Sequence, residues 1–207
     1  MEVSTTLPFE TKVAAMYEWT SKANEAIKNY GFSKSDLAKM VKEIPVVFRD
    51  GAQLFSSILE ENDIPLLIFS AGLGDIIKEI LIQHNFNIPT MHIVSNMMIF
   101  DEKGICVGFN EPLVHVFNKN EANIRNTEYF KEIEAKKNVI LLGDSLGDPH
   151  MSAGLDHDTV FKIGYLNHDV NENLEKYLDI YDVVILNDSA MDFINGVLSL
   201  LVNGDLH

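Results

Sequence analysis

The chain has 207 residues, of which 46% are hydrophobic and 23% charged, as is usual for a globular domain with a sizeable core. Its formal net charge of −15 argues against a nucleic-acid polymer or an anionic membrane as a partner, although a metal ion would still allow a small phosphorylated substrate. We predict a cytoplasmic protein for three reasons. The chain has a single cysteine, Cys106, it has no apolar run of roughly 20 residues, and its N-terminus lacks a signal-peptide pattern.

Two amphipathic helices are expected before any strand. Apolar residues recur at helical spacing from residue 12 to 30, and Gly31 follows as a stop signal. Residues 33–36 start a second helix, which runs to about Glu43 and ends ahead of Pro45.

From residue 46 onwards, short apolar strands alternate with helices. The pattern predicts helices at 52–60, 74–85 and 127–135, strands at 65–69, 92–95, 139–142, 160–163 and 183–186, and a β-hairpin at 98–107 that turns at 102–104. Strands that alternate with helices imply right-handed crossovers and a parallel sheet with helices on both faces.

Residues 138–148 (NVILLGDSLGD) are the most informative segment of the chain. Four consecutive apolar residues run into a glycine turn that carries Asp144 and Asp148. A buried parallel strand ends in this way when its carboxyl edge presents acids to a ligand or a metal. Two carboxylates on one loop form a hard oxygen site suited to Mg²⁺ and, through it, to phosphate. The alternative is a strand followed by a solvated acidic loop.

A second turn, residues 68–75 (IFSAGLGD), places Ser70 at the end of a strand, ahead of glycines and a helix. A hydroxyl, free backbone N–H groups and a helix dipole together favour an anion, so this turn predicts a phosphate cradle. The alternative is that Ser70 merely caps the helix. Lys119, between the two turns in sequence, could neutralise a phosphoryl group or remain solvated.

The order of a serine, a lysine and a Gly-Asp-x-x-x-Asp loop resembles the second, third and fourth motifs of the haloacid dehalogenase-like phosphohydrolases. Segments throughout the chain resemble the cytosolic pyrimidine 5'-nucleotidase family (type III): 16–19, 69–72, 116–119, 125–130, 141–145 and 162–167. The resemblance implies an α/β fold with a Rossmann-like parallel sheet of the haloacid dehalogenase type. It further implies a partial helical cap at residues 1–45 and a core at residues 46–207.

The resemblance also assigns roles around a metal and a base. Asp144 would be a Mg²⁺ ligand, and Asp148 would hold a metal-bound water or support the site. Trp19 falls in the family's helical cap, where an aromatic ring can stack on a nucleotide base. A hydrophobic residue in the core of the cap is the alternative for Trp19.

For the phosphate, the resemblance implies that Ser70 and the backbone N–H groups of Ala71 and Gly72 bind the phosphoryl oxygens. Lys119 would bridge the phosphate and the nucleophile. The implied substrates are nucleoside 5'-monophosphates such as CMP and UMP, or 7-methylguanosine monophosphate in one branch. The implied reaction is Mg²⁺-dependent hydrolysis through an aspartyl-phosphate, and we favour a monomer.

The family's nucleophile lies in an Asp-x-Asp-x-Thr motif at the end of its first strand, and no such motif precedes Ser70. The chain's Asp-x-Asp, Asp156 to Asp158, comes before a strand and hence at the wrong edge of a sheet for this chemistry. The family's first strand lies between the strands that end at Ser70 and Gly143, so its loss would expose two strand edges. The neighbouring strands could close the gap, residues 3–7 could substitute, or the chain could be a fragment or a shortened isoform.

Two functions therefore stay open from the sequence. The first is the 5'-nucleotidase activity that the resemblance implies. The alternative is a catalytically inactive, truncated form that binds magnesium or phosphate or acts as a protein-interaction module. A receiver-like signalling domain would need an acid triad at strand ends, which Asp144 and Asp148 on one loop do not supply. The seven histidines show no metal-ligand spacing.

Overall fold

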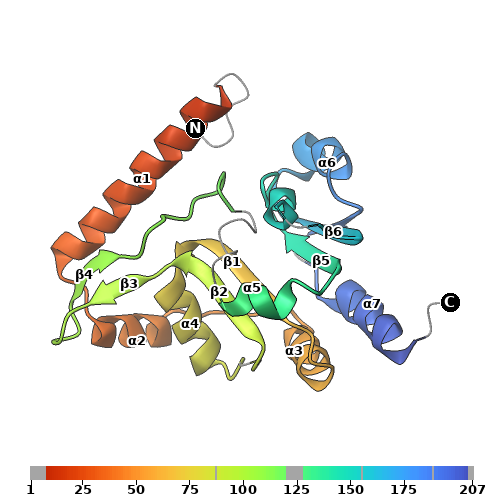
Figure 1. Cartoon of the computed structure of the whole chain (residues 1–207), viewed down its shortest axis with the longest axis horizontal. Coiled ribbons are helices and arrows are strands. Elements are labelled where there is room, and N and C mark those ends of the chain that lie inside the picture. Colours follow the sequence, from red (N-terminus) through yellow and green to blue (C-terminus); the bar gives the residue numbers. More distant parts are fainter. Residues whose placement is uncertain (1–7, 87, 120–127, 155, 188, 205–207) are drawn as a thin grey trace. The chain divides into compact units, whose positions relative to one another are not determined.

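The computed structural model describes residues 8–86, 88–119, 128–154, 156–187 and 189–204 (Figure 1). These residues fall into two compact units. Unit 1 draws on Met1–Val46, Leu67–Phe86 and Ile93–Lys119. Unit 2 draws on Val47–Leu66, Asn87–His92 and Asn120–His207. Each unit is described by itself.

The two N-terminal helices of unit 1 confirm the sequence prediction. Helix α1 (Phe9–Tyr30) ends at Gly31, whose backbone is left-handed (φ 75°) and whose N–H donates to the carbonyl of Lys28. Helix α2 (Lys34–Glu43) starts from Ser33 in a capping box with Asp36.

Unit 1 contains most of a two-stranded sheet and a complete hairpin. Strand β1 (Leu66–Leu73) leads into helix α4 (Gly74–Gln83) and pairs with strand β2 (Met91–Asn96). Strands β3 (Met98–Phe100) and β4 (Cys106–Phe109) pair antiparallel, which confirms the predicted hairpin.

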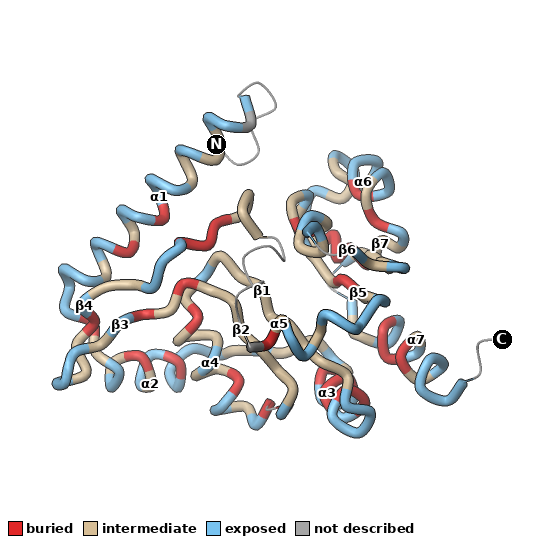
Figure 2. The backbone as a smooth tube through the Cα atoms, in the orientation of Figure 1, coloured by how far each residue is buried: buried red, intermediate tan, exposed pale blue. Residues whose placement is uncertain are grey.

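The core of unit 1 joins the hairpin to the helices. The buried residues of α2, Leu37 and Val41, are four positions apart and so lie on one face of the helix, as the amphipathic pattern requires (Figure 2). The cluster has these buried members: Phe32, Leu37, Val41, Met98 and Cys106. Partly buried side chains of α4 and β4 pack against this cluster.

Unit 2 is built on a parallel sheet in the order β5 (Asn138–Gly143), β6 (Thr159–Leu166) and β7 (Val183–Leu186). Its helices are α3 (Ala52–Glu61), α5 (Glu128–Ile133), α6 (Val170–Leu178) and α7 (Asp192–Asn203), with a 3₁₀ turn, η2, at Asp148–Ser152. The predicted class, α/β with parallel strands, is thus confirmed.

The structure adds two helices that the sequence analysis does not predict. Helix α6 starts at Asp169 with no side-chain cap, and α7 contains Asn195, Gly196 and Ser199, which weaken intrinsic helix propensity. Both helices have one apolar side, so tertiary packing rather than local preference stabilises them.

Strands β1 and β2 form one sheet, and β5, β6 and β7 form another. Closure of the gap by the neighbouring strands stays a prediction. Residues 3–7, the other expected substitute, lie outside the described ranges. The division into a cap (1–45) and a core (46–207) stays a prediction, although one boundary between the units falls at Val46.

None of the described helices has both the length and the apolarity required to cross a bilayer.

The ring of Tyr181 packs closely against two glycines of the sheet in unit 2. Gly143 of β5 and Gly164 of β6 are paired in register, and the buried ring of Tyr181 lies against both. A Cβ on Gly164 would be 2.7 Å from two ring carbons of Tyr181. Glycine is therefore required at this position by the approach of an aromatic ring.

We predict that Gly164→Ala lowers the free energy of unfolding by about 1–3 kcal/mol, because the added methyl displaces the ring of Tyr181. Gly196→Ala is the matched control: no atom lies within 4 Å of its added Cβ, and alanine favours the helix there by up to about 1 kcal/mol. Urea unfolding of both variants measures the difference. Equal stability of the two would contradict the packing argument.

Candidate functional site

The predicted site residues fall into two groups, one in each unit. Ser70, Ala71, Gly72 and Lys119 belong to unit 1, as does Trp19 on α1. Asp144 and Asp148 belong to unit 2, at the carboxyl end of β5. Each group is considered in turn.

The predicted phosphate cradle lies within a strand rather than after one. The sequence predicts a strand that ends at residue 69, but β1 continues to Leu73. The expected boundary at residue 69 was therefore wrong, and Ser95 Oγ of β2 donates to the carbonyl of Gly72 in the added part of β1 at 2.8 Å. The N–H of Gly72 donates to Ser70 Oγ at 3.1 Å, so a phosphoryl oxygen would replace Ser70 as the acceptor of this N–H.

A residue that the sequence analysis misses, Asn96, joins the cradle to the segment that carries Lys119. Asn96 ends β2 and is 2% exposed. Its Nδ2 donates to the carbonyls of Ala71 (2.9 Å) and Val114 (2.8 Å), and its Oδ1 accepts the N–H of Val114 at 2.8 Å. A polar residue at the end of an apolar strand is the only sequence signal that points to it.

The segment ahead of Lys119 is held by its own side chains. Asn118 Oδ1 accepts the N–H of His115, and Asn118 Nδ2 donates to the carbonyl of Leu113, both at 2.7 Å. The N–H of Phe117 donates to His115 Nδ1 at 3.2 Å. Lys119 therefore follows a turn whose backbone is fixed on both sides.

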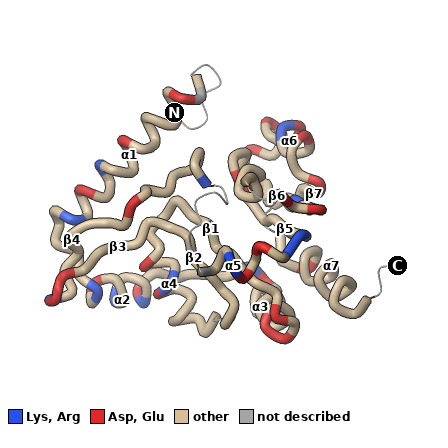
Figure 3. Tube along the Cα trace, viewed as in Figure 1, with Lys and Arg blue, Asp and Glu red and all other residues tan. Residues whose placement is uncertain are grey.

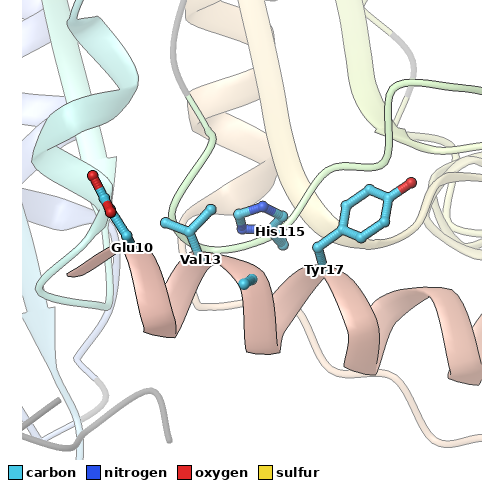
Figure 4. A pocket seen from close by; sticks show the side chains of 5 residues that line it. Glu10, Val13, Tyr17 and His115 are labelled. Atoms are coloured by element: carbon cyan, nitrogen blue, oxygen red, sulfur yellow. The ribbon is translucent and has the colours of Figure 1, made fainter. Parts of the chain in front are cut away.

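His115 is buried and takes part in this turn through its unprotonated Nδ1. Its side chain also lines a cavity of about 530 Å³ with Glu10, Val13, Ala14 and Tyr17 of α1 (Figure 4). Burial lowers the pKa of His115 below its usual range. A neutral ring is consistent with its role as an acceptor.

Trp19 lies on α1 but does not line this cavity. Its side chain is 65% exposed in the described chain, so the alternative reading as a core residue of the cap is wrong. The expected stacking on a base stays a prediction.

In unit 2 the two acids of the loop have different environments. Asp148 is 3% exposed, and its Oδ2 accepts the N–H groups of Asp144 and Ser145, each at 3.0 Å. Asp144 is exposed. One carboxylate thus orders the loop, while the other is presented to solvent.

Two tyrosines, which the sequence analysis misses, hold the carbonyls of the same loop. The hydroxyl of Tyr177 donates to the carbonyl of Asp144, and that of Tyr181 donates to the carbonyl of Ser145, both at 2.6 Å. Their rings stack with centroids 5.4 Å apart. Burial, and after it the nearby carboxylates, raises the pKa of both tyrosines, so both hydroxyls stay protonated donors at neutral pH.

The donor set of this loop fits part of a magnesium site. Mg²⁺ prefers carboxylate oxygens and commonly binds through one or two of them together with water and substrate phosphate. Asp144 fits one such ligand, because its carboxylate is exposed on a loop whose backbone is already hydrogen-bonded. Among the described residues, no group of three or more His, Cys, Asp or Glu side chains is arranged to hold a metal ion.

The rejected Asp-x-Asp pair lies where the sequence analysis expects it. Asp158 immediately precedes β6, and its N–H donates to the carbonyl of Lys137 ahead of β5. Because β5 and β6 are parallel, Asp156 and Asp158 lie at the amino edge of the sheet, opposite to Asp144. They are therefore unsuited to act with Asp144.

We predict that Asp148→Ala lowers the free energy of unfolding by roughly 2–4 kcal/mol, because two backbone N–H groups lose a charged acceptor. Asp144→Ala, on the same loop but exposed, should change stability by no more than about 0.5 kcal/mol. Urea unfolding without added metal makes the comparison. Similar losses in the two variants would show that Asp148 does not order the loop.

We also predict a pH effect from His115. Because its folded-state pKa lies below the unfolded value, its contribution is complete above about pH 6.5 and is lost as the pH falls below that value. In His115→Asn, an amide oxygen can accept the N–H of Phe117 without titrating. The free energy of unfolding should therefore fall more between pH 7.5 and 5.5 in the unmodified protein than in the variant. Parallel pH profiles would be the contrary result.

The chain is similar to known proteins along most of its length. A family model described as Pyrimidine 5'-nucleotidase (UMPH-1) matches residues 1–202. A 7-methylguanosine phosphate-specific 5'-nucleotidase A from Xenopus laevis is 42% identical over 202 residues, which cover 97% of this chain and 70% of that protein. The Homo sapiens 7-methylguanosine phosphate-specific 5'-nucleotidase is 43% identical over 188 residues, or 90% of this chain and 63% of that protein.

A solved structure is similar along the same length. The crystal structure of cytosolic 5'-nucleotidase IIIB bound to cytidine matches with a TM-score of 0.90 and 34% sequence identity, covering 98% of this chain and 68% of that chain. Both the sequence and the α/β fold with parallel strands are thus shared with enzymes that remove a 5'-phosphate. The chain belongs to the pyrimidine 5'-nucleotidase family.

Proposed function

We propose that this protein acts on nucleoside 5'-monophosphates in a magnesium-dependent phosphate hydrolysis. The observation that carries the proposal is the loop after β5, where buried Asp148 and two tyrosines hold the backbone and Asp144 is left exposed. A loop ordered in this way presents a carboxylate without reorganisation when a ligand binds.

The phosphoryl group would bind in unit 1 in this proposal. Ser70 Oγ and the N–H groups of Ala71 and Gly72 would donate to its oxygens, and Lys119 would neutralise part of its charge. Acidic side chains are frequent in the hairpin, at the end of α3 and around α6 (Figure 3), and the net charge is −15. A dianionic ligand therefore requires local positive charge, which is why we assign Lys119 to it.

Asp144 would hold Mg²⁺ in this scheme, and Mg²⁺ in general supplies charge neutralisation to a phosphoryl group. Asp148 would hold the backbone at Asp144 in place and would not contact the ligand, because its Oδ2 already accepts two N–H groups. Trp19, exposed on α1, is our candidate for stacking on the base.

The names of the similar proteins support the proposed substrate class. Two of them are named for 7-methylguanosine phosphate, and the solved structure holds cytidine. CMP, UMP and 7-methylguanosine monophosphate are therefore the candidates. We further propose a cytoplasmic location, because the chain has a single cysteine and because the similar solved structure is of a cytosolic enzyme. The monomer that the sequence analysis favours stays a proposal.

A second function is favoured by one observation. The chain's Asp-x-Asp pair lies at the amino edge of the sheet, so these residues supply no nucleophile beside Asp144. A chain that binds Mg²⁺ and nucleotide without turnover, or that acts through another protein, is the alternative.

We predict that phosphate is released from at least one of CMP, UMP and 7-methylguanosine monophosphate in the presence of MgCl₂. Asp144→Asn should lower the release at least 100-fold, in the range found for loss of one electrostatic group in an active site. Asp156→Asn, an exposed acid at the opposite edge, is the matched control and should behave like the unmodified protein.

Calorimetric binding of CMP, with and without MgCl₂, separates the two functions. Magnesium-dependent binding that Asp144→Asn abolishes, together with no phosphate release, would support the binding function. Neither release nor magnesium-dependent binding would overturn the proposal as a whole.

A further inference from the structure

We propose that Asn96 is a positioning residue, which holds the phosphate cradle and the lysine-bearing segment in one fixed arrangement. The inference rests on the proposed function, because it treats Ser70–Gly72 and Lys119 as parts of one phosphate site. Asn96 itself would not touch the ligand. Its side chain is occupied by backbone groups on both sides.

The three hydrogen bonds of Asn96 connect segments that are far apart in the sequence. Ala71 is 25 residues from Asn96 in one direction, and Val114 is 18 residues away in the other. At 2.8–2.9 Å each bond has good length, and at 2% exposure water cannot replace any of them. The amide is therefore the direct link between the two segments.

The chemistry of this position selects asparagine. Two carbonyls need two donors, and the N–H of Val114 needs one acceptor, all at one short side chain. A primary amide offers two N–H donors and a carbonyl in one plane, whereas a carboxylate offers acceptors alone and a hydroxyl offers one donor. Any replacement leaves at least one buried backbone group without a partner.

Each of the two segments that Asn96 joins contains or adjoins a predicted site residue. Ala71 lies between Ser70 and Gly72, whose side chain and N–H bond to each other. Val114 begins the turn that Asn118 and His115 hold, and Lys119 follows that turn directly. A shift at Asn96 would therefore change the spacing between the cradle and Lys119.

Ser95, the neighbour of Asn96, provides a control within the same strand. Its Oγ donates to the carbonyl of Gly72 at 2.8 Å and so supports the cradle. In the described part of the chain its side chain makes no hydrogen bond to residues 113–118. A change at Ser95 should loosen one segment, and a change at Asn96 should loosen both.

A second control is matched in burial. Asn195 on α7 is 3% exposed, and its Nδ2 donates to the carbonyl of Gly51 at 2.9 Å. It belongs to unit 2 and to no predicted site. Asn195→Asp therefore reports the effect of a buried amide-to-acid change on stability alone.

The first test is hydrogen–deuterium exchange, read by mass spectrometry on the full chain. We expect Asn96→Asp, which preserves size but cannot donate, to speed exchange in both 70–74 and 113–119. Ser95→Ala should speed exchange in 70–74 only, and Asn195→Asp in neither. Faster exchange in one segment alone for Asn96→Asp would overturn the proposed link.

The second test is calorimetric titration of the same proteins with inorganic phosphate, at a temperature where circular dichroism shows each variant folded. We expect a Kd about tenfold or more weaker in Asn96→Asp, because a displacement of about 1 Å is enough for such a loss. The Kd of Asn195→Asp should stay within twofold of the unmodified protein. An unchanged Kd in Asn96→Asp would overturn the positioning role.

The two tests separate the inference from the function on which it rests. Failure of the unmodified protein to bind phosphate would overturn the phosphate site and with it the functional part of the inference. The exchange data would still decide whether Asn96 joins the two segments.

Discussion

The loop after β5 depends on one buried carboxylate. Asp148 accepts two backbone N–H groups with a single oxygen, and no exposed side chain could hold both against competition from water. The stacked tyrosines then satisfy the carbonyls of the same two residues. Asp148 and the two tyrosines thus pair with the backbone groups of the turn, and the carboxylate of Asp144 is left exposed at a strand end.

Unit 1 uses the same principle with a neutral side chain. Asn96 pairs with backbone groups of β1 and of the 113–118 turn, while Ser70 and Lys119 are the residues to which the proposed function assigns a role. In both units a buried polar side chain thus fixes the backbone next to a proposed site residue. Buried polar groups of this kind have to be fully paired, which makes their neighbours rigid.

The chain belongs to the pyrimidine 5'-nucleotidase family. In the proposed function, the net charge of −15 makes local positive charge important, because Lys119 and backbone N–H groups would have to attract a dianionic phosphate against the overall field. The step that breaks the phosphate ester needs a nucleophile as well. Asp156 and Asp158 lie at the opposite edge of the β5–β6 sheet from Asp144.

The sequence by itself determined the local features: α1 and α2 with their stop and start signals, the hairpin, the parallel strands of unit 2 and the two glycine-rich turns. These follow from periodicity, capping and turn chemistry, which act over a few residues. Only the tertiary structure decided the continuation of β1 through Ser70, the helices α6 and α7, and the roles of Asn96, Tyr177 and Tyr181. Each of these depends on hydrogen bonds or packing between residues distant in the sequence, from 18 positions for Asn96 and Val114 to 144 for Asn195 and Gly51, and no local pattern records such contacts.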